Sequence, residues 1–134
     1  MSVEVTFIMI KPEGLKRNLV GKIIQRFEEK GLVLKRILSK IPSRELVEEH
    51  YGHLREKFYF NDMCAKLSSD IVICMEWEGP EAIAISRALI GATNPVNALP
   101  GTIRGDFALD IDNNVVHGSD SVENAEKELK LWFK

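Results

Sequence analysis

The sequence predicts an α/β domain in which a four-stranded antiparallel sheet packs against helices. Three observations support that fold class: runs with strand periodicity alternate with runs of helical periodicity, glycine and proline separate most of these runs, and 45% of the 134 residues are hydrophobic. A chain of this length and composition can bury one core. We therefore expect a single domain over residues 1–134.

The first third of the chain predicts a strand, a helix and a second strand. Apolar residues alternate from Val3 to Ile10, and a Lys-Pro-Glu-Gly turn follows. Apolar positions within residues 19–30 repeat with helical spacing, and Gly31 is typical of a helix end. Residues 32–41 alternate again, which predicts a strand with an apolar face of Val33, Ile37 and Ile41.

A helical hairpin is predicted between this strand and the next. Ser43 can cap a first helix, and an aromatic cluster at residues 57–60 leads into a second one. His50 and His53 are three residues apart and could ligate a metal, but no nearby carboxylate or cysteine completes a site. We therefore expect these two histidines to lie on a solvated helix face.

The second half of the chain predicts further strands and helices around a long loop. Residues 71–78 form a strand and residues 81–90 a helix, after which both periods vanish in residues 92–105. A loop of that length itself suggests a function. The remaining expected elements are a strand at 107–111, a strand at 115–117 and a helix capped by Asp120 or Ser121.

The predicted order is strand, helix, strand, helical hairpin, strand, helix and strand. It matches the βαββαβ pattern of ferredoxin-like folds, in an α+β sandwich whose antiparallel sheet carries helices on one face. Such folds host many functions, so function has to be inferred from particular side chains.

Charge and composition exclude several classes of protein. The formal net charge of -2 and the pI near 5.9 argue against a dedicated nucleic-acid or anionic-membrane surface. The sequence shows no basic leader and no apolar run of about 18 residues, so we expect a cytoplasmic protein without a membrane segment. Cys64 and Cys74 lack C-x-x-C spacing and lie in apolar patterns, which predicts buried thiols.

Four side chains at breaks between elements favour phosphate chemistry. His117 ends a strand, and at neutral pH an unperturbed histidine has one ring nitrogen with a free lone pair. Lys11, Arg87 and Arg104 add cations, which bind phosphoryl oxygens and neutralise the charge that develops on them. Residues 14–23 look like a P-loop but have six residues between the glycines and no Ser or Thr after the lysine, so that motif is absent.

Three separated motifs carry a resemblance to a known family. They are TFIMIKPEG at residues 6–14, GTIRGDF at 101–107 and NVVHGSDS at 114–121. In this order they resemble the signatures of nucleoside diphosphate kinases, over essentially the whole chain. The resemblance implies a ping-pong phosphotransferase of broad base and sugar specificity that maintains NTP and dNTP pools. His117 would take the γ-phosphoryl group from a nucleoside triphosphate, mainly ATP, as phosphohistidine and pass it to a nucleoside diphosphate.

The resemblance also implies a role for each site residue. Glu128 would orient the imidazole of His117, and Ser119 would place a hydroxyl near the transferred group. Mg²⁺ would bridge the β- and γ-phosphates and travel with the nucleotide, with no metal site in the chain itself. The expected nucleotide ligands are Lys11, Arg87, Thr93 and Arg104 at the phosphates, Asn114 and Lys11 at the sugar, and Tyr59 and Met63 at the base.

Taken singly, these residues have ordinary structural interpretations. Lys11 and Arg104 could be solvated loop cations, and His117 could be a buried structural histidine. The corresponding interpretations are a helix C-terminal charge for Arg87, a hydrophobic cluster for Tyr59, a turn for Thr93, an αL position for Asn114 and a surface carboxylate for Glu128. The joint fit to an ordered pattern favours the catalytic interpretation.

Two departures from the family pattern bear on nucleotide affinity. Where the family usually has Arg-Pro-Phe-Phe, residues 57–60 are Lys-Phe-Tyr-Phe, so the rigid proline turn is absent and we expect a more mobile entrance. Asn113 stands where an arginine is common.

The resemblance further implies a homo-oligomer, with a hexamer favoured over a tetramer. The first helix and the segment Leu131-Trp132-Phe133 offer apolar surface that a partner subunit could cover. Two competing functions stay open: a non-enzymatic, nucleotide-sensing member of the same fold, and an RNA-binding module that uses exposed aromatic side chains. His117 beside Lys11 and Arg104 argues against the nucleotide sensor, and the acidic balance argues against the RNA-binding module.

Overall fold

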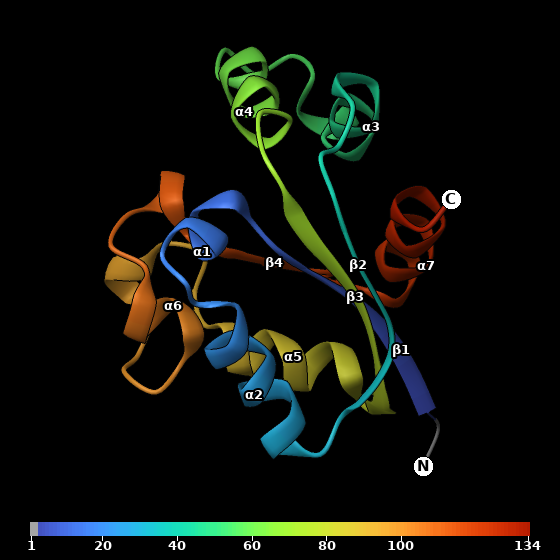
Figure 1. Ribbon diagram of the computed structural model, residues 1–134, viewed down its shortest axis with the longest axis vertical. Helices are drawn as coiled ribbons and strands as arrows, with labels where there is room; N and C mark the ends of the chain where they lie inside the picture. The colour runs from blue at the N-terminus through green and yellow to red at the C-terminus, as the bar shows by residue number, and fades with distance from the viewer. Residues whose placement is uncertain (1–2) are drawn as a thin grey trace.

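A four-stranded antiparallel sheet runs through the centre of the molecule in the computed structural model, which describes residues 3–134 (Figure 1). The strands are β1 (Val3–Ile10), β2 (Val33–Lys40), β3 (Val72–Pro80) and β4 (Val116–Gly118). Their order across the sheet is β2-β3-β1-β4, and every neighbouring pair is antiparallel. The ferredoxin-like arrangement predicted from the order of elements is therefore confirmed.

Helices cover both faces of the sheet, whereas the sequence interpretation placed them on one (Figure 1). Phe7 and Met9 of β1 pack with α3 (Arg44–His50), α4 (Phe60–Leu67) and α7 (Val122–Trp132). Ile8 and Ile10 pack with α2 (Val20–Lys30) and α5 (Ala82–Ile90) on the opposite face. The expectation failed because β1 is apolar at successive positions, which is typical of a strand buried on both sides.

The edge strand β2 differs from its predicted packing. Val33 and Ile37 are 54% and 48% exposed, and the inward side chains are Leu34 and Leu38. The pairing with β3 is irregular between Leu34 and Arg36, so Leu34 packs into one core cluster and Leu38 into the other. Alternation alone could not show this bulge.

Several helix boundaries follow the predicted caps. The Ser43 hydroxyl accepts from the N–H of Leu46 at the start of α3, and the Ser121 hydroxyl accepts from the N–H of Asn124 at the start of α7. Ser121, one of the two residues expected to cap the last helix, is therefore the cap. Between residues 3 and 134, no helix is both long and apolar enough to cross a bilayer.

Two short helices were missed, and one predicted strand is wrong. α1 (Pro12–Lys16) replaces the expected turn, because proline is well suited to the first position of a helix. Thr102 accepts from the N–H of Gly105 and starts α6 (Ile103–Phe107), which occupies the end of the long loop and consumes the start of the strand expected at 107–111. The rest of the loop carries a short 3₁₀ turn at Pro95–Asn97, and a second one at Ile111–Asn113 follows the region of the expected strand.

The end of α7 is buried within the chain. Leu131 is 5% exposed and Trp132 fully buried, with its ring stacked 5.9 Å from that of Phe7. The expectation that this segment offers surface to a partner is therefore wrong for both residues, because they complete the core beside β1. Cys64 and Cys74 are buried and free, as predicted.

Candidate active site

A strained turn places His117 beside the end of β1. Val115, before β4, has a φ of 61°, which is rare for a β-branched residue. The N–H of Val116 donates to the Asn114 carbonyl across it at 2.8 Å, closing a three-residue turn. Such a turn costs about 1–3 kcal/mol and persists where the surrounding structure imposes it. Here the N–H of Lys11 donates to the Val115 carbonyl at 2.9 Å and ties the turn to β1.

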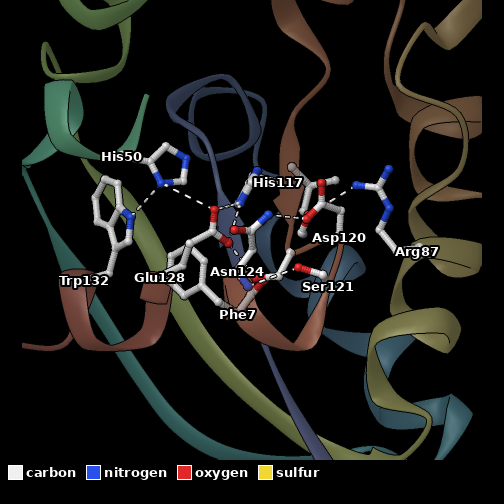
Figure 2. Close-up of polar contacts among 12 residues, drawn as sticks. Phe7, His50, Arg87, His117, Asp120, Ser121, Asn124, Glu128 and Trp132 are labelled. Atoms are coloured by element: carbon white, nitrogen blue, oxygen red, sulfur yellow. Dashed lines mark hydrogen bonds and ion pairs between the residues drawn. The ribbon is translucent and has the colours of Figure 1, made fainter. Parts of the chain in front are cut away.

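A carboxylate orients the His117 imidazole (Figure 2). Its Nε2 lies 3.1 Å from both Oε1 and Oε2 of Glu128 on α7, and the Ser119 hydroxyl donates to Oε1 at 2.5 Å. An ionised carboxylate only accepts, so Nε2 carries the proton and Nδ1 keeps its lone pair. Burial raises the pKa of Glu128. The hydrogen bonds from His117 and Ser119, together with the charge interactions with His117 and His50, outweigh burial and bring this pKa below its usual value.

His50 contradicts its predicted place on a solvated face. Its side chain is buried, its Nδ1 accepts a hydrogen bond from the Trp132 indole N–H at 3.1 Å, and its ring stands edge-on to His117 with centroids 4.8 Å apart. Burial, followed by the charge of His117, lowers the pKa of His50 to about 3, so this histidine is neutral. His53, three residues later, is exposed as predicted. The sequence carried no signal for the difference, since tertiary packing against α7 decides it.

The same cluster is the one group of metal-ligand type in residues 3–134. One ligand atom each from His50, His117 and Glu128 lie within 4.8 Å of one another. Each atom already has a partner, because His50 Nδ1 accepts from Trp132 and His117 Nε2 faces Glu128. The cluster is thus a closed hydrogen-bond network.

Lys11 and Arg104 are not the solvated loop cations that a single-residue interpretation favours. The Lys11 ammonium donates to Asn114 Oδ1 at 2.8 Å, and burial, followed by the charges of Arg104 and Lys66, lowers its pKa to about 8. The Arg104 side chain is buried and donates to the carbonyls of Val116 at 2.8 Å and Gly91 at 3.3 Å. Its pKa is lowered to about 10 by burial and by Arg87.

Lys11, Arg87 and Arg104 lie close to one another, and none of the three forms an ion pair within residues 3–134. The Arg87 guanidinium donates to the Gly118 carbonyl at 3.2 Å, one residue beyond His117. The Nε of Arg104 is buried and has no hydrogen-bond partner within the described part of the chain. A buried N–H without a partner is uncommon, and together with the clustered positive charge it gives this group of residues the properties of an anion site.

Of the remaining predicted ligands, Asn114 and Thr93 are connected to this cluster, whereas Tyr59 and Met63 lie on or next to α4. The Asn114 amide donates weakly to the Thr93 carbonyl at 3.5 Å, and the Thr93 side chain is exposed. Tyr59 is the N-cap residue of α4 and is 38% exposed, and Met63 lies one turn later and is half-buried. The hydroxyl-bearing ring of Tyr59 is therefore accessible, as a stacking surface has to be.

Lys66, which the sequence interpretation missed, connects α4 to the segment before Asn114. Its ammonium donates to the Asp112 carbonyl and to Asn113 Oδ1, both at 2.7 Å. Asn113 is held in turn by Asp110, whose carboxylate accepts from its backbone and side-chain N–H groups. An arginine at position 113 would lack this acceptor, so the Lys66 hydrogen bond to this side chain depends on Asn113.

Comparison with known proteins agrees with this geometry. The family model for nucleoside diphosphate kinase matches residues 4–134. The chain belongs to the nucleoside diphosphate kinase family. The resemblance seen in the three motifs is thereby confirmed, and the activity is that of a kinase acting on nucleotides.

Relatives of high identity cover almost the whole chain. A nucleoside diphosphate kinase of Exiguobacterium sp. is 53% identical over 131 residues, which are 98% of this chain and 94% of that protein. Nucleoside diphosphate kinase 1 of Spinacia oleracea is also 53% identical, covering 98% of this chain and 88% of the relative. Identity of this extent favours the kinase over the RNA-binding module.

Solved structures of the family share the fold. The apo nucleoside diphosphate kinase of Encephalitozoon cuniculi has a TM-score of 0.94 at 53% identity and covers 96% of this chain and 88% of that one. The nucleoside diphosphate kinase family protein of Babesia bovis has a TM-score of 0.96 at 47% identity, with 98% and 88% covered. The family fold is therefore retained throughout this chain.

Proposed function

We propose that the chain transfers the γ-phosphoryl group of a nucleoside triphosphate, mainly ATP, to a nucleoside diphosphate through a phosphohistidine on His117. The carrying observation is that Glu128 holds Nε2 and leaves the lone pair of Nδ1 available. In the first half-reaction Nδ1 forms a bond to the γ-phosphorus, and the bond from phosphorus to the β,γ-bridging oxygen breaks. The diphosphate leaves with that electron pair, and a second diphosphate reverses the step.

Glu128 and Ser119 are the proposed positioning groups for this chemistry. The imidazole gains positive charge as Nδ1 bonds to phosphorus, and the ionised Glu128 stabilises it at Nε2. The Ser119 hydroxyl donates to the same carboxylate, which fixes the direction in which Glu128 points. Both groups would act without accepting the phosphoryl group themselves.

Lys11, Arg87, Thr93 and Arg104 are the proposed phosphate ligands. The positive charges of Lys11, Arg87 and Arg104 repel one another in the free protein, and a bound anionic phosphate chain would reduce this repulsion. Mg²⁺ would neutralise part of the β- and γ-phosphate charge. Glu128, the carboxylate nearest His117, is engaged by His117 and Ser119, which fits a metal ligated by the nucleotide.

Asn114, Tyr59 and Met63 are the proposed sugar and base contacts. The contact between Asn114 and the Lys11 ammonium would place an amide and a cation together at the sugar. Stacking on an aromatic face needs no base-edge hydrogen bonds, which supports broad base specificity. Steady-state kinetics test the whole scheme: double-reciprocal plots at several acceptor concentrations should be parallel, and converging lines would indicate direct transfer in a ternary complex.

Tyr59→Ala is expected to raise KM for purine and pyrimidine nucleotides alike, because about 1–3 kcal/mol of stacking is lost. Tyr59→Phe keeps the ring and should change KM little. The measurement is KM for ATP, GTP, CTP and UTP with each variant. Loss confined to one base class would mean that hydrogen bonds to base edges determine specificity.

Nucleotide affinity is expected to fall as the pH rises past about 8, because Lys11 then loses its charge. The stability of the free protein should change in the opposite direction. Between about 8 and 10.5 the unfolded lysine binds more protons than the folded one, so the free energy of unfolding rises with pH in that window. KM measured from pH 7 to 10 should rise, and Lys11→Arg, which stays charged, should flatten the rise.

We also propose a single domain over residues 1–134 that forms a cytoplasmic homo-oligomer, with a hexamer favoured over a tetramer. Val33, Ile37 and Ile41 expose apolar surface at the β2 edge, and Val96, Leu99, Leu109 and Ile111 expose more around α6. Light scattering at micromolar concentration should give several times 15.2 kDa. A fully active monomer would contradict this proposal.

A further inference from the structure

His50 Nδ1 lies between a donor and a carboxylate (Figure 2). The Trp132 indole N–H is 3.1 Å from it on one side, and Glu128 Oε2 is 3.6 Å away on the other. An indole N–H can only donate, so His50 Nδ1 has to accept and carries no proton. The proton of the neutral ring is therefore on Nε2.

This arrangement decides how Glu128 is shared. Glu128 Oε2 lies 3.1 Å from His117 Nε2 and 3.6 Å from His50 Nδ1. A proton on His50 Nδ1 would turn the second contact into an ion pair in competition with the first. While the Trp132 N–H donates to His50 Nδ1, this nitrogen cannot carry a proton. The Glu128 carboxylate then accepts hydrogen bonds from His117 and Ser119.

We propose that Trp132 and His50 are a positioning pair that reserves the Glu128 carboxylate for His117 by holding His50 in its neutral, Nδ1-accepting tautomer. The inference rests on the proposed role of His117 as the phosphoryl carrier. Neither member of the pair contacts the reacting atoms in this scheme, and both act through Glu128.

The donor is held firmly enough for this role. The Trp132 side chain is fully buried, stacks on Phe7 and lies 5.4 Å from the His50 ring in an edge-on contact. The Lys40 ammonium donates to the Trp132 carbonyl at 2.8 Å, which anchors the end of α7 to β2. The indole N–H therefore has a fixed direction.

The charged and titratable groups around His50 determine whether its ring would take up a second proton. Tyr51 and His53 approach His50 from its own segment, and Glu128 approaches it from α7. His117 on β4 and Lys11 at the end of β1 add groups that are or can become positively charged. Among these charges, Glu128 alone favours protonation of His50. Removing the indole N–H frees Nδ1 toward this carboxylate.

The test is Trp132→Phe, which keeps an aromatic ring against Phe7 and removes the N–H donor. His50 should then titrate at higher pH and draw Glu128 from His117, so the acid limb of the kcat profile should move up by about one pH unit. The ratio of kcat at pH 6 to kcat at pH 8 should therefore fall relative to the parent protein, by up to about ten-fold. Adding His50→Asn removes the titrating group and should abolish this shift.

A purely structural role for Trp132 predicts something different. Trp132→Phe would then lower kcat by the same factor at every pH, and an unshifted acid limb would overturn the proposal. A measurement on the parent protein removes dependence on how the variant folds: ¹⁵N shifts of His50 should show a protonated Nε2 and bare Nδ1 at pH 6. A doubly protonated His50 there would also overturn it.

Failure of the underlying function has a separate signature. Intact mass after ATP and Mg²⁺ at pH 8 shows whether the parent protein takes up a phosphoryl group on His117. If it does not, the proposed carrier is wrong. If it does, and the acid limb of Trp132→Phe is unshifted, the positioning pair alone is wrong.

Discussion

Replacing His117 with alanine is expected to reduce phosphoryl transfer by at least about 10⁴-fold, because the site has no second nucleophile that can take the role. The Ser119 hydroxyl donates to Glu128 and is buried, and His50 has its Nδ1 occupied by Trp132. His117 Nδ1, in contrast, makes no hydrogen bond within residues 3–134 and keeps its lone pair available. The measurement is transfer from ATP to GDP at saturating Mg²⁺.

The fold should survive this substitution. The polar partner of the His117 ring is Glu128, which keeps the Ser119 hydrogen bond when the ring is lost. Circular dichroism and thermal unfolding should therefore resemble those of the parent protein. His53→Ala is the matched control, since His53 is exposed and its loss should leave activity intact. Appreciable transfer by His117→Ala would refute the proposed carrier.

Arg104→Met is expected to lower kcat/KM by about 10²–10³-fold, the range seen when one fixed donor to a developing negative charge is removed. Arg104 is 4% exposed and has a buried Nε without a partner in residues 3–134, so its charge acts in a site of low solvent content. Methionine fills similar space without the charge. Single-turnover measurement separates the loss in chemistry from the loss in binding.

Two further variants make the Arg104 result interpretable. Arg104→Lys keeps the charge but loses the planar fork, so we expect an intermediate loss. Arg17→Met removes an exposed arginine that donates to the Phe107 carbonyl and should leave kcat/KM close to the parent value. Equal losses for Arg104→Met and Arg17→Met would show that surface charge in general, and not a site arginine, supports catalysis.

Most of the fold could be predicted because local signals and tertiary packing agree. The cap residues Ser43 and Ser121, and Gly31 at the end of α2, mark helix boundaries with a local mechanism. The ferredoxin-like arrangement followed from the order of elements along the chain. The failures occur where one segment has two compatible conformations, as at residues 107–111, or where a bulge reverses the faces of β2.

The candidate site residues were predicted mainly from sequence motifs. The motifs do not include the residues that pack against the site from other parts of the chain. The Arg104 charge reaches Lys11, and Glu128 contacts the His117 imidazole. The catalytic and binding roles of these residues stay predictions. His50 was assigned to solvent because its spacing from His53 says nothing about α7, which comes from the other end of the chain. Its partner Trp132 is 82 positions away in the chain, and the contact exists because α3 and α7 share one face of the sheet.

The most direct test of the central claim is intact-mass spectrometry after brief incubation with ATP and Mg²⁺. We expect one added phosphoryl group per chain, labile in acid, stable in base and located on His117 by peptide analysis, as a phosphoramidate requires. Addition of GDP should remove it and form GTP in equal amount. An unmodified chain that still forms GTP, or a phosphoryl group that survives acid on a serine, would contradict the proposed mechanism.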